Sequence, residues 1–456
     1  MKFSVSALVA LGALASSVQA IDLNPDDVQS IKKAASIAAK GLRKWYTGDR
    51  PGDTPGNLPD PYYWWEAGAM FGAFIDYWYY TGDTTYNAIT KQALIHQIGD
   101  YQAFMPPNQT RTLGNDDQAF WGMAALTAAE DKFPDPAEGE APSWLSLAQA
   151  VFNTQQRRWD NATCGGGLKW QIFPFNNGYN YKNTISNGCF FNIAARLAKY
   201  TGNETYSTWA ERAWNWERAI GLMSPEYYFY DGTDDRKNCS EVDHHQWTYN
   251  AGVHMAGAAA MWNLTQSDPS RERLWRERLA GVIKSIDIFF HREVKDVMVE
   301  VACEFNNKCN NDQRSFKAYL SRWMGYTMQV APWTVGDLMP KLRTSAVAAA
   351  KQCNAEGEAQ TCGLRWYTNG QNDGSFGPGE QMSAMEVFQN LLIKEVPGPV
   401  TLNNGGISKS NPEAGSEEQH LPTNLDDVTT GDKAGAGILT TVVLVGILGG
   451  AWWMVS

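Results

Sequence analysis

Basic residues are scarce relative to acidic ones in this 456-residue sequence. It has 38 Lys and Arg against 49 Asp and Glu, which leaves a formal net charge of −11 at pH 7. An acidic surface repels the phosphates of nucleic acids and the headgroups of anionic lipids. We therefore expect neither nucleic acid nor an anionic membrane surface to be the partner of this protein.

Motifs for phosphate and metal binding are also missing. The glycine-rich stretch CGGGLKW at 164–170 lacks the Gly-Lys-Ser/Thr of a phosphate loop, so nucleotide binding is not indicated. The acidic stretch that begins at Asp231 has Arg236 where a calcium loop needs glycine. The adjacent His244 and His245 lack the spacing of a zinc site. We expect no metal and no cofactor.

Apolar runs lie at both ends of the sequence. Residues 1–20 combine a lysine, an apolar stretch and a small-x-small ending at Val18–Ala20, which is typical of a secretory signal peptide. The run Ile438–Ser456 follows the small residues between Gly431 and Gly437, as in a removable GPI-attachment signal. The alternative is a C-terminal transmembrane helix, which the missing stop-transfer lysines and arginines disfavour. We expect a secreted protein that a GPI anchor holds at the outer face of the plasma membrane and in the cell wall.

Cysteines and glycosylation sequons fit this location. Seven cysteines in an oxidising compartment indicate disulfide bonds. Cys303–Cys309 and Cys353–Cys362 are close enough in sequence to close small loops, and Cys164–Cys239 is the remaining pair that we propose. Cys189 lies in an apolar run and is left as a buried free thiol. Five N-x-Ser/Thr sequons place their asparagines on the surface; they are Asn108, Asn161, Asn203, Asn238 and Asn263.

The composition divides the remaining sequence into three parts. Residues 21–396 are uniform, with no linker, heptad run or low-complexity segment, so we expect one catalytic domain there. Residues 397–431 turn to Gly, Asn, Ser, Glu and Thr, which predicts a flexible, solvated stalk. The attachment signal would occupy residues 432–456.

Helical periodicity dominates the domain. The segment Thr205–Leu222 has apolar residues on one face and charged residues on the other, as in an outer helix with one wet face. The runs GAMFGAFIDYWYY at 68–80 and GVHMAGAAAMW at 252–262 are apolar nearly all round and rich in Gly and Ala. Helices of that kind are buried on every side.

An internal repeat indicates how these helices are paired. The sequence GAMFGAFIDYWYYTGD at 68–83 has a counterpart in GCFFNIAARLAKYTGN at 188–203. Both end in Tyr-Thr-Gly, where glycine caps a helix, and both continue into an amphipathic helix. A unit of about 60 residues fits six times into the domain. We predict an all-α (α/α)6 barrel, a toroid of six helical hairpins; an irregular all-helical domain is the alternative.

Two adjacent acids precede one of the apolar helices. Asp116 and Asp117 lie in the stretch Leu113–Met123. Neighbouring carboxyls raise one another's pKa, and glycoside hydrolysis needs one ionised and one protonated carboxyl. Helix capping is the alternative, because acids favour a helix N-terminus. Terpene-cyclase chemistry would need a third acid at Phe120 and is not favoured.

Amides, hydroxyls and aromatic rings precede several of the buried helices, where the loops of such a barrel converge on one mouth. Amides suit sugar hydroxyls, and aromatic rings suit the apolar face of a pyranose, although each ring could equally pack in the core. The substrate-binding candidates chosen from these stretches are Trp64, Trp65, Asn115, Gln118, Asn183, Asn187, Asp235, His245, Trp247, Tyr249 and Asn250.

Four ordered motifs resemble those of glycoside hydrolase family 76, and within it the fungal GPI-anchored cell-wall endo-α-1,6-mannosidases. They are NDDQAFW at 115–121, CGGGLKW at 164–170, YKNTISNG at 181–188 and WTYNAG at 247–252. The similarity spans about residues 22–396. The resemblance implies an (α/α)6 barrel that cleaves α-1,6-mannose linkages with retention, with Asp116 as the nucleophile and Asp117 as the general acid/base.

The resemblance also implies a role in wall assembly and leaves three functions open. The first is a retaining endo-α-1,6-mannosidase that acts on mannan or a GPI glycan. The second is a transglycosidase that moves the GPI glycan of anchored proteins onto a wall β-glucan acceptor. The third is a wall-glycan-binding protein without turnover.

Overall fold

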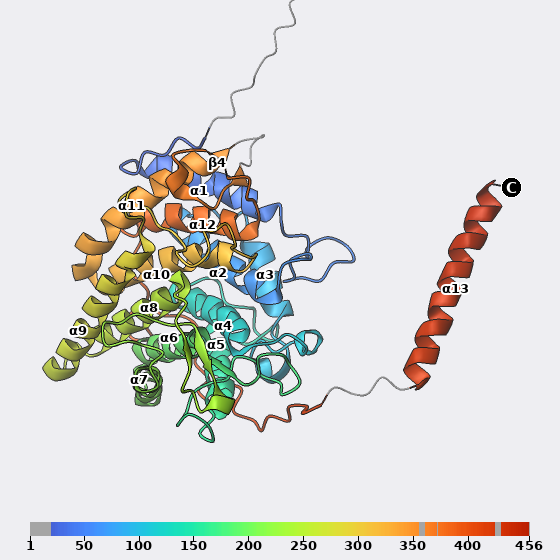
Figure 1. The fold of residues 1–456 in the computed structure, drawn as a ribbon, viewed down its shortest axis with the longest axis horizontal. Helices are drawn as coiled ribbons and strands as arrows, with labels where there is room; N and C mark the ends of the chain where they lie inside the picture. The colour runs from blue at the N-terminus through green and yellow to red at the C-terminus, as the bar shows by residue number, and fades with distance from the viewer. Residues whose placement is uncertain (1–19, 355–360, 372, 425–429, 456) are drawn as a thin grey trace, which may run out of the picture.

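The structure is a computed structural model that describes residues 20–354, 361–371, 373–424 and 430–455 (Figure 1). The predicted signal peptide lies outside these residues except for Ala20. Within the described ranges α-helices dominate and the strands are few and short.

Six helices form a closed inner ring. Each packs against the next one along the chain, from α2 against α4 to α10 against α12, and α12 packs back against α2. This closure confirms the predicted (α/α)6 barrel, and the irregular alternative is wrong. The inner helices are α2 Trp64–Thr81, α4 Asn115–Glu130, α6 Thr184–Thr201, α8 Thr248–Leu264, α10 Phe316–Val330 and α12 Pro378–Gln389.

A second layer of helices covers the ring. α1 packs on α12, α3 on α2, α5 on α4, α7 on α6, α9 on α8, and α11 on α10 and α12. The predicted outer helix is α7, which buries Tyr206, Ala210 and Ala213 and exposes Arg212 and Asn215. The outer helices are α1 Val28–Arg43, α3 Asn87–His96, α5 Trp144–Arg157, α7 Glu204–Ala219, α9 Pro269–Ser285 and α11 Val335–Gln352.

Small residues allow the inner helices to approach one another closely. A Cβ added to Gly252 of α8 would lie 2.8 Å from the ring of Trp323 on α10. A Cβ on Gly257 would lie 2.4 Å from the ring of Phe191 on α6. The Gly- and Ala-rich runs of the sequence therefore reflect contact on every side of a buried helix.

The inner helices all begin at one end of the barrel, which we call the mouth. The repeated Tyr-Thr-Gly marks the opposite, far end, because α2 and α6 both stop there at a left-handed glycine, Gly82 and Gly202. Late residues of several inner helices line a polar cavity at the far end, among them Glu130, Arg196 and Gln329. The loops that lead into the inner helices meet at the mouth, as the sequence predicted.

Short strands brace the loops beside the mouth. β1 and β2 pair antiparallel, with Lys182 opposite Thr233, and β2 pairs antiparallel with β3. A second two-stranded sheet follows α11. The strands are β1 Tyr181–Asn183, β2 Gly232–Asp234, β3 Val242–Asp243, β4 Cys353–Asn354 and β5 Thr361–Cys362.

The features expected of a secreted chain are present. The three predicted disulfides, Cys164–Cys239, Cys303–Cys309 and Cys353–Cys362, all form, and Cys189 is a buried free thiol. The asparagines of four sequons are exposed, and Asn263 is half-buried.

The segment after the barrel differs from the predicted flexible stalk at 397–431. Pro399–Leu421 instead lies along the outside of the barrel, and we call this segment the C-terminal strap (Figure 1). The side-chain amide of Asn153 on α5, for example, donates to the carbonyls of Pro412 and Ala414 at 2.7 and 2.8 Å. The strap is held mainly by hydrogen bonds, so its polar composition resembles that of a solvated segment.

The last helix, α13 Thr430–Val455, follows the strap. Its segment Lys433–Met454 is long and apolar enough to cross a membrane, with a hydropathy of 1.9, and none of it is buried. This helix is compatible with both the predicted GPI signal and a transmembrane helix.

Candidate active site

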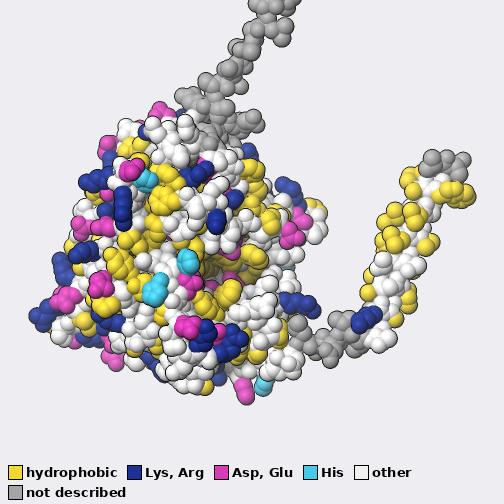
Figure 2. Space-filling view, viewed as in Figure 1, with side chains coloured by type: hydrophobic (Ala, Val, Ile, Leu, Met, Phe, Trp, Pro, Cys, Tyr) yellow, Lys and Arg dark blue, Asp and Glu magenta, His cyan; other side chains and the backbone are white. Residues whose placement is uncertain are grey.

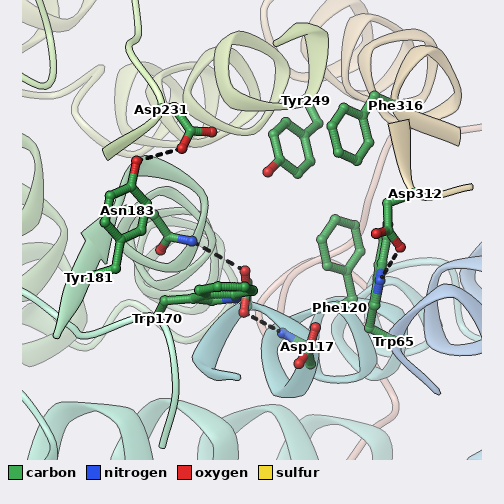
Figure 3. A pocket seen from close by; sticks show the side chains of 11 residues that line it. Trp65, Asp117, Phe120, Trp170, Tyr181, Asn183, Asp231, Tyr249, Asp312 and Phe316 are labelled. Atoms are coloured by element: carbon green, nitrogen blue, oxygen red, sulfur yellow. Dashed lines mark hydrogen bonds between the residues drawn. The ribbon is translucent and has the colours of Figure 1, made fainter. Parts of the chain in front are cut away.

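A pocket of about 630 Å³ lies at the mouth of the barrel, where the face seen in Figure 2 is hollowed. Its side chains come from α2, α4, β1, α8, α10 and the loops between them, and they point toward a common space (Figure 3). The lining residues are Trp65, Asp116, Asp117, Phe120, Trp170, Tyr181, Asn183, Asp231, Tyr249, Asp312 and Phe316.

Asp116 and Asp117 occupy the first turn of α4 and project into the pocket. The Oδ1 of Asp116 accepts a hydrogen bond from the backbone N–H of Asp117 at 3.0 Å, and its Oδ2 accepts one from the amide of Asn183 at 3.4 Å. The Oδ2 of Asp117 accepts from the backbone N–H of Gly114 at 2.6 Å. Asp117 therefore caps α4, and the capping alternative is compatible with a catalytic role.

Glycine at position 114 makes room for the two carboxyls. A Cβ there would lie 2.3 Å from the Oδ1 of Asp116 and 2.9 Å from the Oδ2 of Asp117. Any larger residue would displace at least one of the acids. The position of the pair thus depends on the residue that precedes the helix as well as on the acids.

Both acids hold a proton more tightly than ordinary aspartates. Burial raises the pKa of Asp116 to about 7, although its hydrogen bonds from Asn183 and the backbone act in the opposite direction. Burial raises the pKa of Asp117 well above its usual range, and the negative charges of Asp116 and Asp312 raise it further. Two hydrogen bonds favour the ionised form of Asp116, whereas Asp117 accepts one and faces the negative charge of Asp116, so the surroundings of Asp116 suit the ionised member of the pair.

Aromatic rings form one wall of the pocket. Tyr249 and Phe316 stack with ring centroids 3.8 Å apart, and Phe120 lies between them and Trp65 in Figure 3. The indole N–H of Trp65 donates to Asp312 at 3.0 Å, which fixes both side chains. This wall offers flat apolar surfaces that suit the faces of sugar rings.

A polar wall stands on the other side. Asp231 accepts hydrogen bonds from the hydroxyl of Tyr181 at 2.6 Å and from the indole N–H of Trp247 at 2.8 Å. Burial raises the pKa of Asp231, and these two hydrogen bonds lower it. The polar groups of this wall suit hydroxyl groups of a ligand.

Among the described residues, no group of three or more His, Cys, Asp and Glu side chains is placed to hold a metal ion.

A second pocket of about 930 Å³ continues the first one. Trp65, Asp117, Trp170 and Asp312 line both pockets, whereas Asp116 lines only the first. Together they form an extended cleft that passes over Asp117. The second pocket is lined by Tyr63, Trp64, Trp65, Arg111, Thr112, Asp117, Trp170, Gln171, Asn176, Asn177 and Asp312.

Four of the eleven predicted binding residues line this cleft: Trp64, Trp65, Asn183 and Tyr249. Trp64 reaches the second pocket only, while its indole N–H donates to Gln97 at 2.8 Å. The aromatic rings and amides that precede the inner helices in the sequence therefore identified part of the cleft lining.

Three predicted residues lie behind the cleft. Asn115 and Gln118 are buried and accept hydrogen bonds from the guanidinium of Arg158. The amide of Asn187 bonds both the N–H and the carbonyl of Leu168, at 2.7 and 3.0 Å. They hold α4 and the glycine-rich loop in place, and the structure does not put them in the cleft lining.

The other four predicted residues lie beside the cleft or beneath it. Asp235 forms an ion pair with the lysine of the glycine-rich motif. Trp247 supports the cleft through its hydrogen bond to an aspartate that lines the first pocket. His245 is exposed and contacts a neighbouring aspartate, and Asn250 is fully buried in α8. None of them lines either pocket.

Sequence reasoning missed six residues of the first pocket. Four of them, Phe120, Trp170, Tyr181 and Asp231, belong to stretches that were already singled out, but they were not chosen within them. Asp312 stands just before α10, as the acid pair stands at the start of α4, and the same signal could have found it. The full set is Phe120, Trp170, Tyr181, Asp231, Asp312 and Phe316.

The sequence of the chain is similar to those of known proteins. The sequence pattern of glycosyl hydrolase family 76 matches residues 30–403. Mannan endo-1,6-alpha-mannosidase DCW1 of Saccharomyces cerevisiae is 49% identical over 440 residues, which cover 96% of this chain and 95% of that protein. Mannan endo-1,6-alpha-mannosidase DCW1 of Candida albicans is 43% identical over 459 residues, with 100% of both chains covered.

Solved structures share the fold. Dfg5 from Chaetomium thermophilum, crystallised with glucosamine, superposes with a TM-score of 0.81 at 42% identity and covers 86% of this chain and 97% of its own. An inactive variant of an α-1,6-mannanase from Salegentibacter, crystallised with α-1,6-mannotriose, has a TM-score of 0.62 at 18% identity, with 80% and 99% covered.

Proposed function

Because the chain belongs to glycosyl hydrolase family 76 and is a glycoside hydrolase, we propose that it cleaves α-1,6-mannosidic bonds of mannan or a GPI glycan with retention at the fungal cell surface. The observation that carries this proposal is the acid pair at the floor of an extended cleft with aromatic and polar walls. The relatives named as mannan endo-1,6-alpha-mannosidases support the substrate class.

In the proposed mechanism Asp116 is the nucleophile. The N–H of Asp117 and the amide of Asn183 donate to its two oxygens, so its ionised form is stabilised where it must attack the anomeric carbon. Attack forms a bond from Asp116 to that carbon while the glycosidic bond breaks, and a covalent glycosyl-enzyme results.

Asp117 is the general acid/base of the same mechanism. Its raised pKa keeps a proton available, which passes to the departing glycosidic oxygen as the bond breaks. Asp117 then takes a proton from water, which attacks the glycosyl-enzyme and releases Asp116. Retention follows from the two successive displacements at the same carbon.

The shape of the cleft indicates where each part of the substrate lies. Asp116 faces only the first pocket, so the sugar ring that is attacked would occupy that pocket. Asp117 faces both pockets, as a group that protonates the oxygen between two sugars must. The leaving group would then lie in the second pocket, among Trp64, Gln171 and Asn176.

Transfer to a sugar acceptor is the second candidate. An acceptor such as a wall β-glucan would replace water in the second step, and it would enter the same second pocket after the leaving group departs. The size of that pocket and its aromatic and amide lining favour an ordered acceptor. In this function the GPI glycan of an anchored protein would be the donor.

Attachment at the outer face of the plasma membrane by a GPI anchor remains part of the proposal. The apolar helix α13 at the C-terminal end is compatible with an attachment signal that is removed. Treatment of intact cells with a phospholipase specific for phosphatidylinositol should release the protein. Protein that stays on the cells after that treatment would favour a transmembrane helix instead.

Asparagine substitutions test the catalytic assignment. Asp116→Asn and Asp117→Asn preserve the size of the side chains, so each should reduce turnover of an α-1,6-mannan oligosaccharide by about 10³-fold or more and leave the fold intact. Asp53→Asn, which changes an exposed acid away from the cleft, is the matched control. Wild-type turnover in either cleft variant would overturn the assignment.

Product analysis separates the three functions. Incubation with a mannose-containing GPI glycan, with and without β-glucan, should give free reducing ends from hydrolysis or a longer mixed product from transfer. Binding of mannan without either product would favour the non-catalytic alternative.

A further inference from the structure

The C-terminal strap begins at the far end of the barrel. The N–H of Val400 donates to the carbonyl of Glu130 at 2.9 Å, and the N–H of Leu402 donates to the carbonyl of Tyr200 at 2.9 Å. Glu130 and Tyr200 belong to the last turns of α4 and α6. The chain thus leaves the barrel at the end opposite the cleft.

The strap then runs along α5 toward the mouth. The hydroxyl of Ser143, just before α5, donates to the carbonyl of Lys409 at 2.5 Å. One turn and a half further, the amide of Gln149 bonds Ser410 and Asn411. Another turn further, Asn153 holds Pro412 and Ala414. α5 returns antiparallel to α4, so this path carries the chain from the far end to the mouth.

The strap ends beside the helix that carries the acid pair. The side chain of Gln419 donates to the carbonyl of Thr154 at 3.2 Å and accepts from Arg158 at 3.0 Å. Arg158 also donates to Asn115, the first residue of α4, at 2.9 Å. The N–H of the next strap residue donates to the hydroxyl of Tyr101 at 3.0 Å. This end of the strap is therefore held at the rim of the mouth.

The docked strap shortens the connection to the C-terminal helix. Eight residues, 422–429, separate the end of the strap from α13, and at full extension they span at most about 28 Å. A free stalk over 397–431 would span about 120 Å and would start at the far end. Docking therefore changes both the reach of the barrel above a membrane and the end from which it is held.

We propose that the strap holds the mouth of the cleft close to the membrane in which the C-terminal region is anchored. The enzyme then acts on α-mannose-bearing glycans anchored in that same membrane in preference to soluble glycans with the same linkage. The proposal rests on the proposed function and on membrane attachment through the C-terminal region. It holds for a GPI anchor and for a transmembrane helix alike, because both lie beyond the strap.

A distance measurement tests the orientation without any turnover. The full chain, held in vesicles, is labelled with a fluorophore at Arg236→Cys, exposed on the loop beside the cleft, or at Thr84→Cys, exposed at the far end. The 18 residues of α2 alone span about 27 Å between the two ends. Energy transfer to acceptor lipids should be greater from the label near the mouth; equal or reversed transfer would overturn the proposal.

A spacer variant tests the consequence for substrate choice. Insertion of about 20 flexible residues after residue 424 leaves every strap contact in place and lengthens the tether by about 70 Å. Turnover of a soluble α-1,6-mannoside should stay unchanged, while turnover of the same glycan linked to a lipid of the same vesicle should fall several-fold. An unchanged ratio between the two substrates would overturn the proposal.

Undocking the strap is a second route to the same result. Gln149→Ala combined with Asn153→Ala removes hydrogen bonds along the outside of α5, and Arg157→Ala changes an exposed residue of the same helix as the control. The double variant should lower the ratio of lipid-linked to soluble turnover, and the control should not. Absence of soluble turnover in every form, wild type included, would instead contradict the proposed function and leave the energy-transfer result as the test of orientation.

Discussion

Asp116 and Asp117 are neighbours in sequence, yet they are held differently. Two donors stabilise the ionised form of Asp116, whereas Asp117 has one backbone donor and faces the negative charges of Asp116 and Asp312. The sequence predicted the pair because two acids precede an apolar helix. Asn183 lowers the pKa of Asp116 and Asp312 raises the pKa of both acids; these two residues are far away in sequence, so local reasoning could not supply their effects.

Removal of the Asp312 charge should shift the pH profile of the enzyme. Asp312→Asn keeps an oxygen that can accept from Trp65 but removes a negative charge that raises the pKa of both Asp116 and Asp117. Both limbs of the profile of kcat/KM should move to lower pH by a fraction of a unit, with the bell shape kept. Profiles measured between pH 4 and 9 check this, and a shift toward higher pH would contradict the assigned electrostatics.

The stability of the fold should depend on pH through Asp116. Its pKa is about 7 in the folded chain and near 4 in an unfolded one. The folded state therefore binds the proton more tightly, and this contribution is complete below pH 4 and is lost as pH rises through 7. Asp116→Asn cannot ionise, so its melting temperature relative to wild type should be higher at pH 8 than at pH 4. Equal differences at the two pH values would count against a raised pKa.

At the scale of elements, the N-termini of the inner helices determine the cleft. α4, α6, α8 and α10 each bring at least one lining side chain from their first two turns or from the residue before the helix. Apolar runs predicted α4, α6 and α8, with a glycine cap at the end of α6, whereas the sequence reasoning did not single out α10. The loops between them were harder to predict, because Trp170 and Asp231 are placed by hydrogen bonds between distant segments.

The entry to α4 offers a test at this scale. Gly114→Ala would place a Cβ 2.3 Å from the Oδ1 of Asp116, so the acid pair must move. Turnover should fall by at least about tenfold with the helical content unchanged, since misplaced groups lose much of their effect. Gly336→Ala at the start of α11 is the control, because a Cβ there meets nothing within 4 Å. Wild-type turnover in Gly114→Ala would show that the pair tolerates displacement.

At the scale of the whole molecule, the barrel was predictable from the sequence and the docked C-terminal strap was not. Repeated buried and amphipathic helices indicate a ring, because six such pairs can bury one another's apolar faces. The strap has no such periodicity, since its serines, asparagines and glutamines contribute hydrogen bonds rather than apolar area. Composition therefore predicted a solvated stalk where the structure has a docked segment.

Truncation measures what the strap contributes to stability. A chain that ends after Val396 loses the hydrogen bonds between the strap and α5, whereas a chain that ends after residue 424 keeps them, and both lack α13. The shorter chain should be less stable by roughly 2–5 kcal/mol, since several hydrogen bonds are lost at about 1 kcal/mol each. Denaturant unfolding compares the two, and equal stability would mean that the strap is not docked in solution.

The closure of the ring also constrains how the chain is made. α1 and α2 pack against α12, so the barrel cannot close until nearly 390 residues have been synthesised. At 5–20 residues per second, the roughly 300 to 350 residues between the end of α1 or α2 and the end of α12 take about 15 to 70 seconds to synthesise. During that interval the flank of α2 that packs against α12 has no partner. We therefore expect the nascent protein to need protection by chaperones until α1 and α2 meet α12.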